Sequence, residues 1–116
     1  MIPSGEGYTI IGMQSEVLKG HVDLLLLATL ERSPAHGYRV VEALRERSDG
    51  TFDLAEGTIY PALYRLERGG LIASRWHVVE GRRRRVYRLT HEGETALRQR
   101  RHRWYEFADA MGVALA

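Results

Sequence analysis

The hydrophobic pattern of this chain changes near Leu71 from a helical period to extended stretches around Glu80-Gly81, and it returns to a helical period near Thr90. Before that point, apolar residues three and four positions apart predict three helices, at 14–32, 37–47 and 55–68. After it, two extended stretches flank the turn and predict a hairpin, at 71–79 and 84–89. A last helical stretch covers 90–113. This order predicts a mainly α fold with a small β-hairpin.

Turn and cap residues separate these stretches. Pro34 ends the first helix, because the residue before a proline is pushed out of the helical region. The Ser-Asp-Gly run at 48–50 is typical of a turn, and Gly69-Gly70 ends the third helix since glycine accepts a left-handed cap. Thr90 caps the last helix, although Gly93 stands where a capping box has glutamate or glutamine.

The sequence lacks the residues that several classes of function require. The chain has no cysteine, which excludes disulfides, thiolate nucleophiles and zinc-thiolate sites. Its histidines form no pair at metal-ligand spacing, and no nucleophile elbow or phosphate-cradle motif is present. We therefore expect no enzyme, no cofactor and no metal site. No apolar run approaches the roughly 18 residues of a membrane span and no secretory signal is visible, so we expect no membrane contact and a cytoplasmic protein.

The charged residues are segregated along the chain. Between Arg65 and Arg103 there are twelve arginines and four acidic residues, whereas the rest of the chain has five basic and eleven acidic residues. A genomic preference for arginine would not divide the charge by region. A formal net charge of +2 that hides one strongly basic region is the pattern of a polyanion-binding protein.

The stretch 55–68 has the pattern of a DNA-reading helix. Polar residues gather at its start, where free backbone amides also suit phosphate oxygens. Thr58 and Tyr60 have hydroxyls that can donate to phosphate, and Arg65 can reach a phosphate or a base edge. The same helix also fits an ordinary solvated face. The DNA contacts predicted on it are Glu56, Gly57, Thr58, Tyr60, Tyr64 and Arg65.

Four consecutive arginines follow the hairpin turn: Arg82, Arg83, Arg84 and Arg85. Their guanidinium groups repel one another and gain nothing from a core, so they need solvent or an anionic partner. Their place in a hairpin after a candidate reading helix favours a basic wing laid on or into the DNA minor groove. Because side chains alternate along a strand, we expect at least two of the four to contact DNA but not all four to face the same way.

The last helix has a seam of heptad type. Its members, spaced alternately by four and three residues, are Leu97, Arg101, Trp104, Ala108, Met111 and Leu115, with Arg101 a poor fit and Phe107 widening the apolar face. A small domain has little need of a further long stripe, so we expect pairing with a second copy. The stripe could instead pack on the chain's own first helix. Both arrangements can hold together, with Val17, Leu18 and Val22 joining the seam.

Three helices and a two-stranded ribbon form the winged helix-turn-helix arrangement. The chain then divides into a loose N-terminal arm at 1–13, a winged helix-turn-helix DNA-binding domain at 14–89 and a C-terminal dimerisation helix at 90–116. The alternative is a protein-interaction module that keeps the winged fold and binds a partner protein. A wing with four arginines favours the DNA-binding protein, because a partner-binding wing would not need them.

Five blocks of this sequence resemble the PadR family of transcriptional regulators and occur in the family's order. They are Leu18-Lys-Gly-His-Val-Asp-Leu-Leu-Leu-Leu27, His36-Gly-Tyr38, Glu56-Gly-Thr-Ile-Tyr-Pro-Ala-Leu63, Arg65-Leu-Glu-Arg-Gly-Gly-Leu-Ile72 and Arg83-Arg-Arg-Val-Tyr-Arg-Leu-Thr90. The resemblance implies a winged helix-turn-helix homodimer that represses nearby genes from an inverted-repeat operator. It also implies that Tyr38, Thr58 and Tyr60 help to fix the DNA backbone.

With one helix after the hairpin, the chain resembles the short branch of that family. In part of that branch, planar drug-like molecules bind at the dimer interface, stacked by a tryptophan of the last helix, and Trp104 stands at the matching place. The resemblance therefore implies a small aromatic effector at Trp104. Arg100, Arg101 and Arg103 make its surroundings basic, so an anionic or neutral ligand is expected before a cationic one. We expect a repressor that a small molecule or a stress signal releases from DNA.

Overall fold

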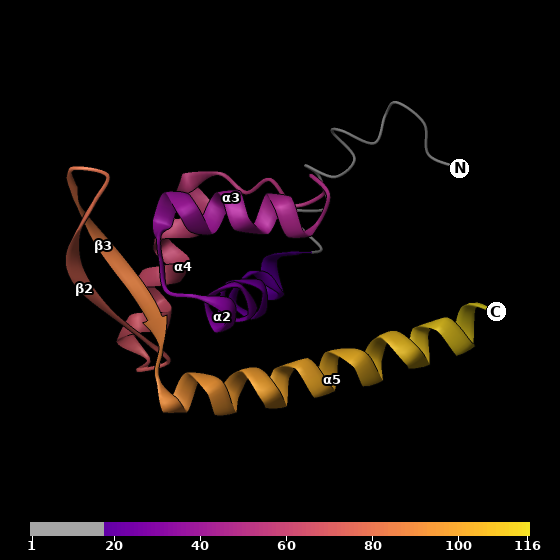
Figure 1. The fold of residues 1–116 in the computed structure, drawn as a ribbon. Coiled ribbons are helices and arrows are strands. Elements are labelled where there is room, and N and C mark those ends of the chain that lie inside the picture. Colours follow the sequence, from indigo (N-terminus) through magenta and orange to yellow (C-terminus); the bar gives the residue numbers. More distant parts are fainter. Residues whose placement is uncertain (1–17) are drawn as a thin grey trace.

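A computed structural model describes residues 18–116; the predicted arm at 1–13, the predicted helix start at 14–17 and Val17 lie outside the described residues. The elements, in chain order, are the 3-10 turn η1 (Leu18–Gly20), helix α2 (Val22–Arg32), strand β1 (Ala35–His36), helix α3 (Gly37–Arg47), helix α4 (Glu56–Arg68), strand β2 (Ile72–Val79), strand β3 (Arg82–Leu89) and helix α5 (His91–Leu115). Helices with one small antiparallel sheet confirm the predicted fold class (Figure 1).

The core lies where α2 meets α3 and α4. Leu26 and Leu27 of α2, Val40 of α3, and Ile59 and Leu63 of α4 have no exposed surface. These positions recur at helical spacing, so the periodicity that predicted the helices also chose their buried faces. Helix α2 contacts α3, α4, α5 and β3 and is therefore the centre of the domain.

The first helix differs from its prediction. Within the described residues the predicted helix at 14–32 is interrupted, because η1 ends at Gly20 and α2 begins only at Val22. The amide of His21 donates to the carbonyl of Leu18 at 2.7 Å, which closes a tight turn at the interruption. The predictions for the next two helices are confirmed: α3 spans the expected residues, and α4 begins one residue later, at Glu56.

Strands β2 and β3 form the wing, which is the hairpin 72–89 with Glu80-Gly81 at its tip. The two tip residues have φ values of 52° and 78°, the left-handed pair that a two-residue hairpin of type I′ requires. Strand β1 pairs with the other edge of β3, opposite Tyr87 and Val86, and gives a sheet of order β1-β3-β2. The sequence did not predict β1, because two residues are too short to show a period.

A joint at Thr90 fixes α5 to the base of the wing. The Thr90 hydroxyl oxygen accepts a hydrogen bond from the amide of Gly93 at 3.0 Å and donates to the carbonyl of Gly70 at 2.6 Å. The predicted cap is thereby confirmed. Gly93 lies against the carbonyl of Leu71, where a β-carbon would collide with it. Glycine replaces the capping-box glutamate because no side chain fits there.

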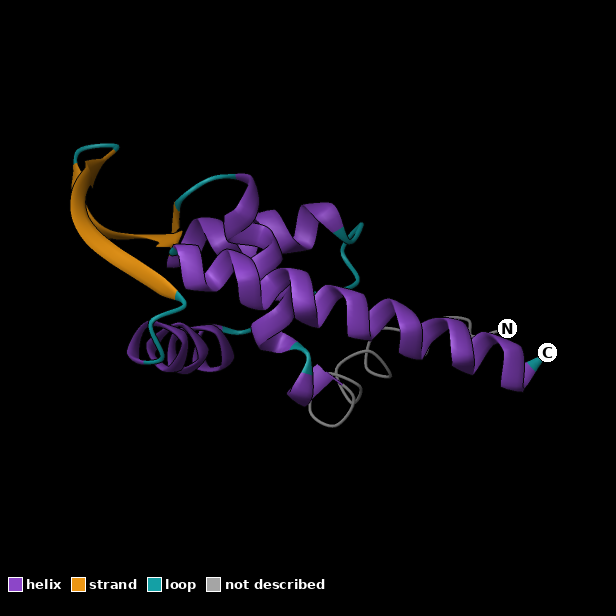
Figure 2. Ribbon diagram, turned by 90° about the horizontal axis from the view of Figure 1, so that it is seen from below, coloured by secondary structure: helices purple, strands orange, loops and turns teal. Residues whose placement is uncertain are grey.

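Helix α5 packs on the body only in its first part. Leu97 is buried against the core, whereas from Trp104 onward most side chains are exposed. The rest of the helix runs past the other helices to the C-terminus (Figures 1 and 2). Among residues 18–116 no helix combines the length and apolar character needed to cross a bilayer.

Candidate nucleic-acid interface

The exposed face of α4 carries an apolar and a cationic side chain in contact. At 100° per residue, Gly57, Tyr64 and Arg68 fall opposite the buried Ile59 and Leu63. Tyr64 is 61% exposed, and the Arg68 guanidinium lies 5.6 Å from the centroid of its ring, a cation–π distance. Arg68 was not among the predicted DNA contacts, although its spacing of four from Tyr64 placed it on the same face of the helix.

The predicted contact Arg65 lies on a flank of α4. Its guanidinium forms an ion pair with Asp23 of α2 at 3.0 Å. The arginine side chain is still 58% exposed, so it keeps surface for a second partner while Asp23 holds its direction. Thr58 lies on the same flank, and Glu56 is exposed in the first turn.

Tyrosines from two helices meet at the start of α3. The Tyr60 ring of α4 covers Gly37 so closely that a β-carbon there would collide with it. Tyr38 is 49% exposed, and its ring stacks parallel to the ring of His36 at 6.4 Å. The Nδ1 atom of His36 accepts from the amide of Arg39 and caps α3. The structure therefore brings two predicted backbone contacts, Tyr38 and Tyr60, to one corner beside the wing.

The wing has two faces, and its arginines divide between them by alternation. The core-side face continues the buried side of the sheet and carries Ser74, Trp76, Arg83 and Arg85. The guanidinium groups of Arg83 and Arg85 lie 4.9 and 5.5 Å from the centroid of the Trp76 ring. The tryptophan thus holds two of the four consecutive arginines.

Arg85 is also tied to α4. Its Nε donates to the hydroxyl of Ser74 at 2.7 Å, and this hydroxyl donates to Glu67 of α4 at 2.6 Å. The Arg85 guanidinium lies 3.8 Å from the same carboxylate. Burial and the nearby Glu67 raise the pKa of Tyr87, which packs beside them. The wing and the helix are therefore joined by a hydrogen-bonded chain.

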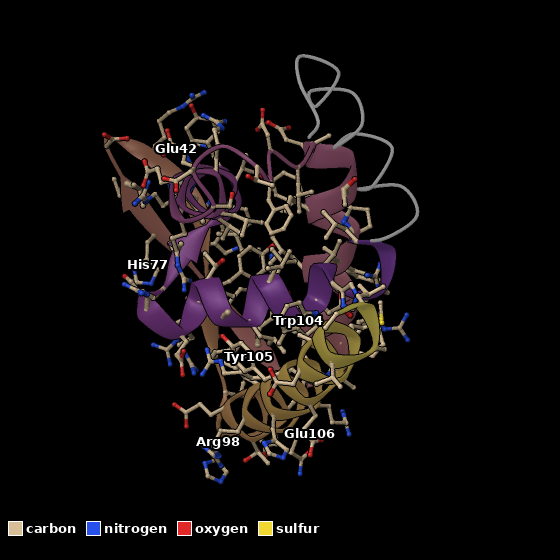
Figure 3. The ribbon with its side chains drawn as sticks, turned by 90° about the vertical axis from the view of Figure 1, so that its right-hand side faces the viewer. Glu42, His77, Arg98, Trp104, Tyr105 and Glu106 are labelled. Atoms are coloured by element: carbon tan, nitrogen blue, oxygen red, sulfur yellow. The ribbon has the colours of Figure 1, made fainter. Side chains whose placement is uncertain are left out.

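The open face of the wing carries Arg75, His77, Arg84 and Arg88. Together with Tyr38 and its neighbours at the start of α3, these side chains line a hollow of about 900 Å³. Glu42 of α3 and His77 lie on the same side of the molecule (Figure 3). Arg75 and Arg88 were not among the predicted contacts; the signal was the alternation that places them on one face with Arg84.

The predicted dimer seam is divided by the structure. Leu18, Val22 and Leu97 are already buried in the core of a single chain. Arg101 donates to Glu31 of α2 at 2.8 Å; this hydrogen bond holds the pKa of Glu31 below its usual value and raises the pKa of Arg101. The poor fit of Arg101 to the seam is explained by this internal pair. The exposed apolar members are Trp104, Phe107, Met111 and Leu115.

A second, smaller hollow of about 220 Å³ lies between the start of α2 and α5. It is lined by Gly20, His21, Leu24, Arg100, Arg103, Trp104 and Phe107. Trp104 is 39% exposed and its ring meets Tyr105 edge-on at 5.5 Å. Within the part of the chain that the structure describes, no three histidine or acidic side chains gather as a metal site would require.

Comparisons with known proteins agree on one family. The model of the transcriptional regulator PadR-like family matches residues 26–99. The chain is 44% identical over 73 residues to the Mycobacterium tuberculosis transcriptional regulator Rv3488, covering 63% of this chain and 55% of that protein. A PadR family transcriptional regulator from Eggerthella lenta superposes with a TM-score of 0.78 at 33% identity, covering 94% of each chain. A PadR family regulator from Clostridium difficile gives a TM-score of 0.74 at 36% identity, covering 83% of this chain and 99% of that one.

Proposed function

The chain belongs to the PadR-like family of transcriptional regulators, which are not enzymes, and from this premise we propose that it is a cytoplasmic repressor that binds an inverted-repeat operator as a homodimer. The observation that carries the proposal is the exposed face of α4 beside an arginine-rich wing. A helix of this size enters the major groove, and an adjacent wing meets the neighbouring phosphates or minor groove.

The proposed contacts fall into two groups. The start and exposed face of α4 read bases and meet phosphates, together with Tyr38 at the adjoining corner, through Glu56, Gly57, Thr58, Tyr60, Tyr64 and Arg65. The wing supplies positive charge through Arg82, Arg83, Arg84 and Arg85, of which at least two contact DNA. Free amides at the α4 N-terminus favour phosphate oxygens, and the wing arginines supply the salt-dependent part of the affinity.

Dimerisation is proposed to use the exposed part of α5. Phe107 and Met111 are 59% and 44% exposed, and with Trp104, Ala108 and Leu115 they lie on one side of the helix. Burying this stripe against its two-fold copy removes apolar surface from water and sets the distance between two reading helices. This assignment narrows the predicted seam to the members that a single chain leaves exposed.

An effector is proposed to bind beside Trp104. Arg100 and Arg103 line the small hollow together with this aromatic ring, so a planar anionic or neutral molecule fits the charge better than a cation. Because the hollow lies where α2 and α5 meet, a ligand there would favour one angle between the dimer helix and the DNA-binding domain. Release from DNA then requires that the ligand bind the two dimer shapes unequally.

The double substitution Arg83→Ala with Arg84→Ala tests the proposed function. We expect affinity for the protein's own upstream DNA to fall by about tenfold or more and the salt slope to decrease by about two or more, because phosphate contacts from both protomers are lost. Gel-shift titration at several salt concentrations measures both quantities. The matched control, Arg32→Ala with Arg98→Ala, removes the same charge from residues outside α4 and the wing and should change neither.

Unchanged affinity and slope in the double variant would reject the wing as a DNA contact. Filter binding with random duplex at low salt then separates a DNA-binding protein from a protein-interaction module. Retention on the filter supports the former, since non-specific affinity comes from the phosphates.

The substitution Trp104→Phe tests the effector site. We expect a planar aromatic carboxylate to quench the fluorescence of the unmodified protein with saturation, and the variant to lose most of that signal with at least about fivefold weaker binding, since the larger indole ring stacks better. A planar cation of the same size serves as the comparison ligand. Equal quenching in both proteins would assign the signal to Trp76 and contradict a site at Trp104.

A further inference from the structure

We propose that the two faces of the wing have different tasks: Arg75, Arg84 and Arg88 on the open face hold the DNA backbone together with Tyr38, whereas Arg85 on the core-side face is a strut that fixes the wing to α4. This inference rests on the proposed function and assigns the wing's contacts residue by residue. It adds Arg75 and Arg88, which lie outside the run of four arginines.

The strut is a continuous chain of contacts between α4 and the wing. Arg85 donates to Ser74 at 2.7 Å, and Ser74 donates to Glu67 at 2.6 Å. The Arg85 guanidinium also lies 3.8 Å from the Glu67 carboxylate and 5.5 Å from the Trp76 ring. A phosphate at Arg85 would have to approach that carboxylate and displace these partners. Arg85 is therefore better suited to position the wing than to bind DNA.

Trp76 extends the strut toward the tip of the wing. The residue is 55% exposed, and its ring lies beside both Arg83 and Arg85 on the core-side face. Cation–π attraction favours guanidinium groups that lie over the ring face, so the tryptophan biases two flexible side chains toward one orientation. Two of the four consecutive arginines are thus directed by an aromatic ring before any DNA arrives.

The arginines on the open face are unpaired within the described part of the chain. Within residues 18–116, no hydrogen bond or ion pair engages the guanidinium groups of Arg75, Arg84 or Arg88. The strand register places Arg75 opposite Val86, midway between the other two arginines, so the three side chains are cross-strand neighbours. Three unpaired cations in one row need an anionic ligand or solvent.

The shape of this row favours a polyanion over a compact anion. Arg84 and Arg88 are four residues apart on β3, which is about 13 Å along a strand. DNA presents one phosphate per about 3.4 Å of axis on each strand, so a backbone segment can meet such a row at several points. The hollow continues to Tyr38, a half-exposed residue whose hydroxyl can donate to the same backbone. Of the acidic residues lining the hollow, Glu42 pairs with Arg39 at 3.5 Å and Glu80 lies at the wing tip.

Single alanine substitutions separate the two tasks by their salt dependence. Arg75→Ala, Arg84→Ala and Arg88→Ala should each lower the salt slope of operator binding by about two per dimer, because each removes one phosphate contact per protomer. Arg85→Ala should weaken operator binding by about fivefold or more. It should lower the salt slope by no more than about one per dimer, half the change expected for each open-face variant. A slope change for Arg85 as large as that for Arg84, or an unchanged slope for Arg75 and Arg88, would overturn the assignment.

Glu67→Ala tests the strut, because loss of a negative charge and loss of the strut change operator affinity in opposite directions. Removing a negative charge close to DNA ordinarily tightens binding, whereas loss of the strut loosens the wing and should weaken operator binding by about threefold or more. Glu80→Ala is the matched control, since it removes the same charge at the wing tip and should tighten binding or leave it unchanged. Equal or tighter operator binding by the Glu67 variant, with an unchanged melting temperature, contradicts the strut.

These outcomes are distinct from failure of the proposed function. If the wing does not bind DNA at all, the double variant of Arg83 and Arg84 also keeps the original slope. If only the inference fails, that double variant loses slope while the single variants follow another pattern.

Discussion

Alanine at Gly93 is expected to lower the melting temperature by roughly 15 °C, because overpacking at this joint costs about 3 kcal/mol or more. The added β-carbon would collide with the carbonyl of Leu71, which is main chain and cannot rotate away. The collision also separates Thr90 from Gly70, and with it the junction between the wing and α5. Thermal unfolding followed by circular dichroism measures the effect.

Gly112→Ala is the matched control, since it makes the same change on the same helix where no atom lies within 4 Å of the new β-carbon. Alanine is the better helix former, so this variant should be as stable as the original protein or more stable by up to about 1 kcal/mol. If the two variants had the same melting temperature, close packing at Gly93 would not be the reason for glycine there.

Glutamate at both Phe107 and Met111 is expected to convert the protein to a monomer and to reduce operator affinity by about 100-fold or more. Both side chains are exposed on the part of α5 that leaves the body, so a single chain loses little on their replacement. Four buried carboxylates at a two-fold interface would repel one another. Without the dimer, the second half-site no longer benefits from a high effective concentration, which accounts for the loss of affinity.

Analytical ultracentrifugation and gel shift on the same samples measure mass and affinity. Gln99→Glu with Val113→Glu is the matched control, because it adds the same charge to the opposite side of α5. This control should stay dimeric and keep its operator affinity. A dimer formed by the Phe107 and Met111 variant would place the interface elsewhere.

Much of the fold was predictable from local residue patterns. The spacing of Tyr38, Val41 and Leu44, with Val40 beside them, predicted α3 and most of its buried side. The prediction was wrong for Tyr38, which is 49% exposed. Two extended stretches around the glycine-containing pair Glu80-Gly81 predicted the hairpin turn, and both residues have positive φ values in the structure. Thr90 predicted the start of α5 through a hydrogen bond that spans only three residues. In each case the interaction that decides the structure lies within a few residues of the signal.

The candidate site was predictable in its location but not in its pairings. The sequence indicated α4 and the four arginines as the basic surface. It could not show that Arg65 pairs with Asp23, 42 residues away, or that Arg101 pairs with Glu31, 70 residues away. The strand β1 was missed for a related reason, since its two residues become a strand only through pairing with β3.

The sequence by itself determined that a hairpin bearing consecutive arginines follows a helix with an exposed polar start, because periodicity and turn geometry act between near neighbours. The tertiary structure decided which arginines remain unpaired. Glu67 comes from α4 and Ser74 from β2, and only the packing of these elements brings their oxygens to Arg85 while it leaves Arg84 without a partner among the described residues. Whether an arginine is paired depends on which oxygens lie near its guanidinium group, and the packing of the whole core sets those positions.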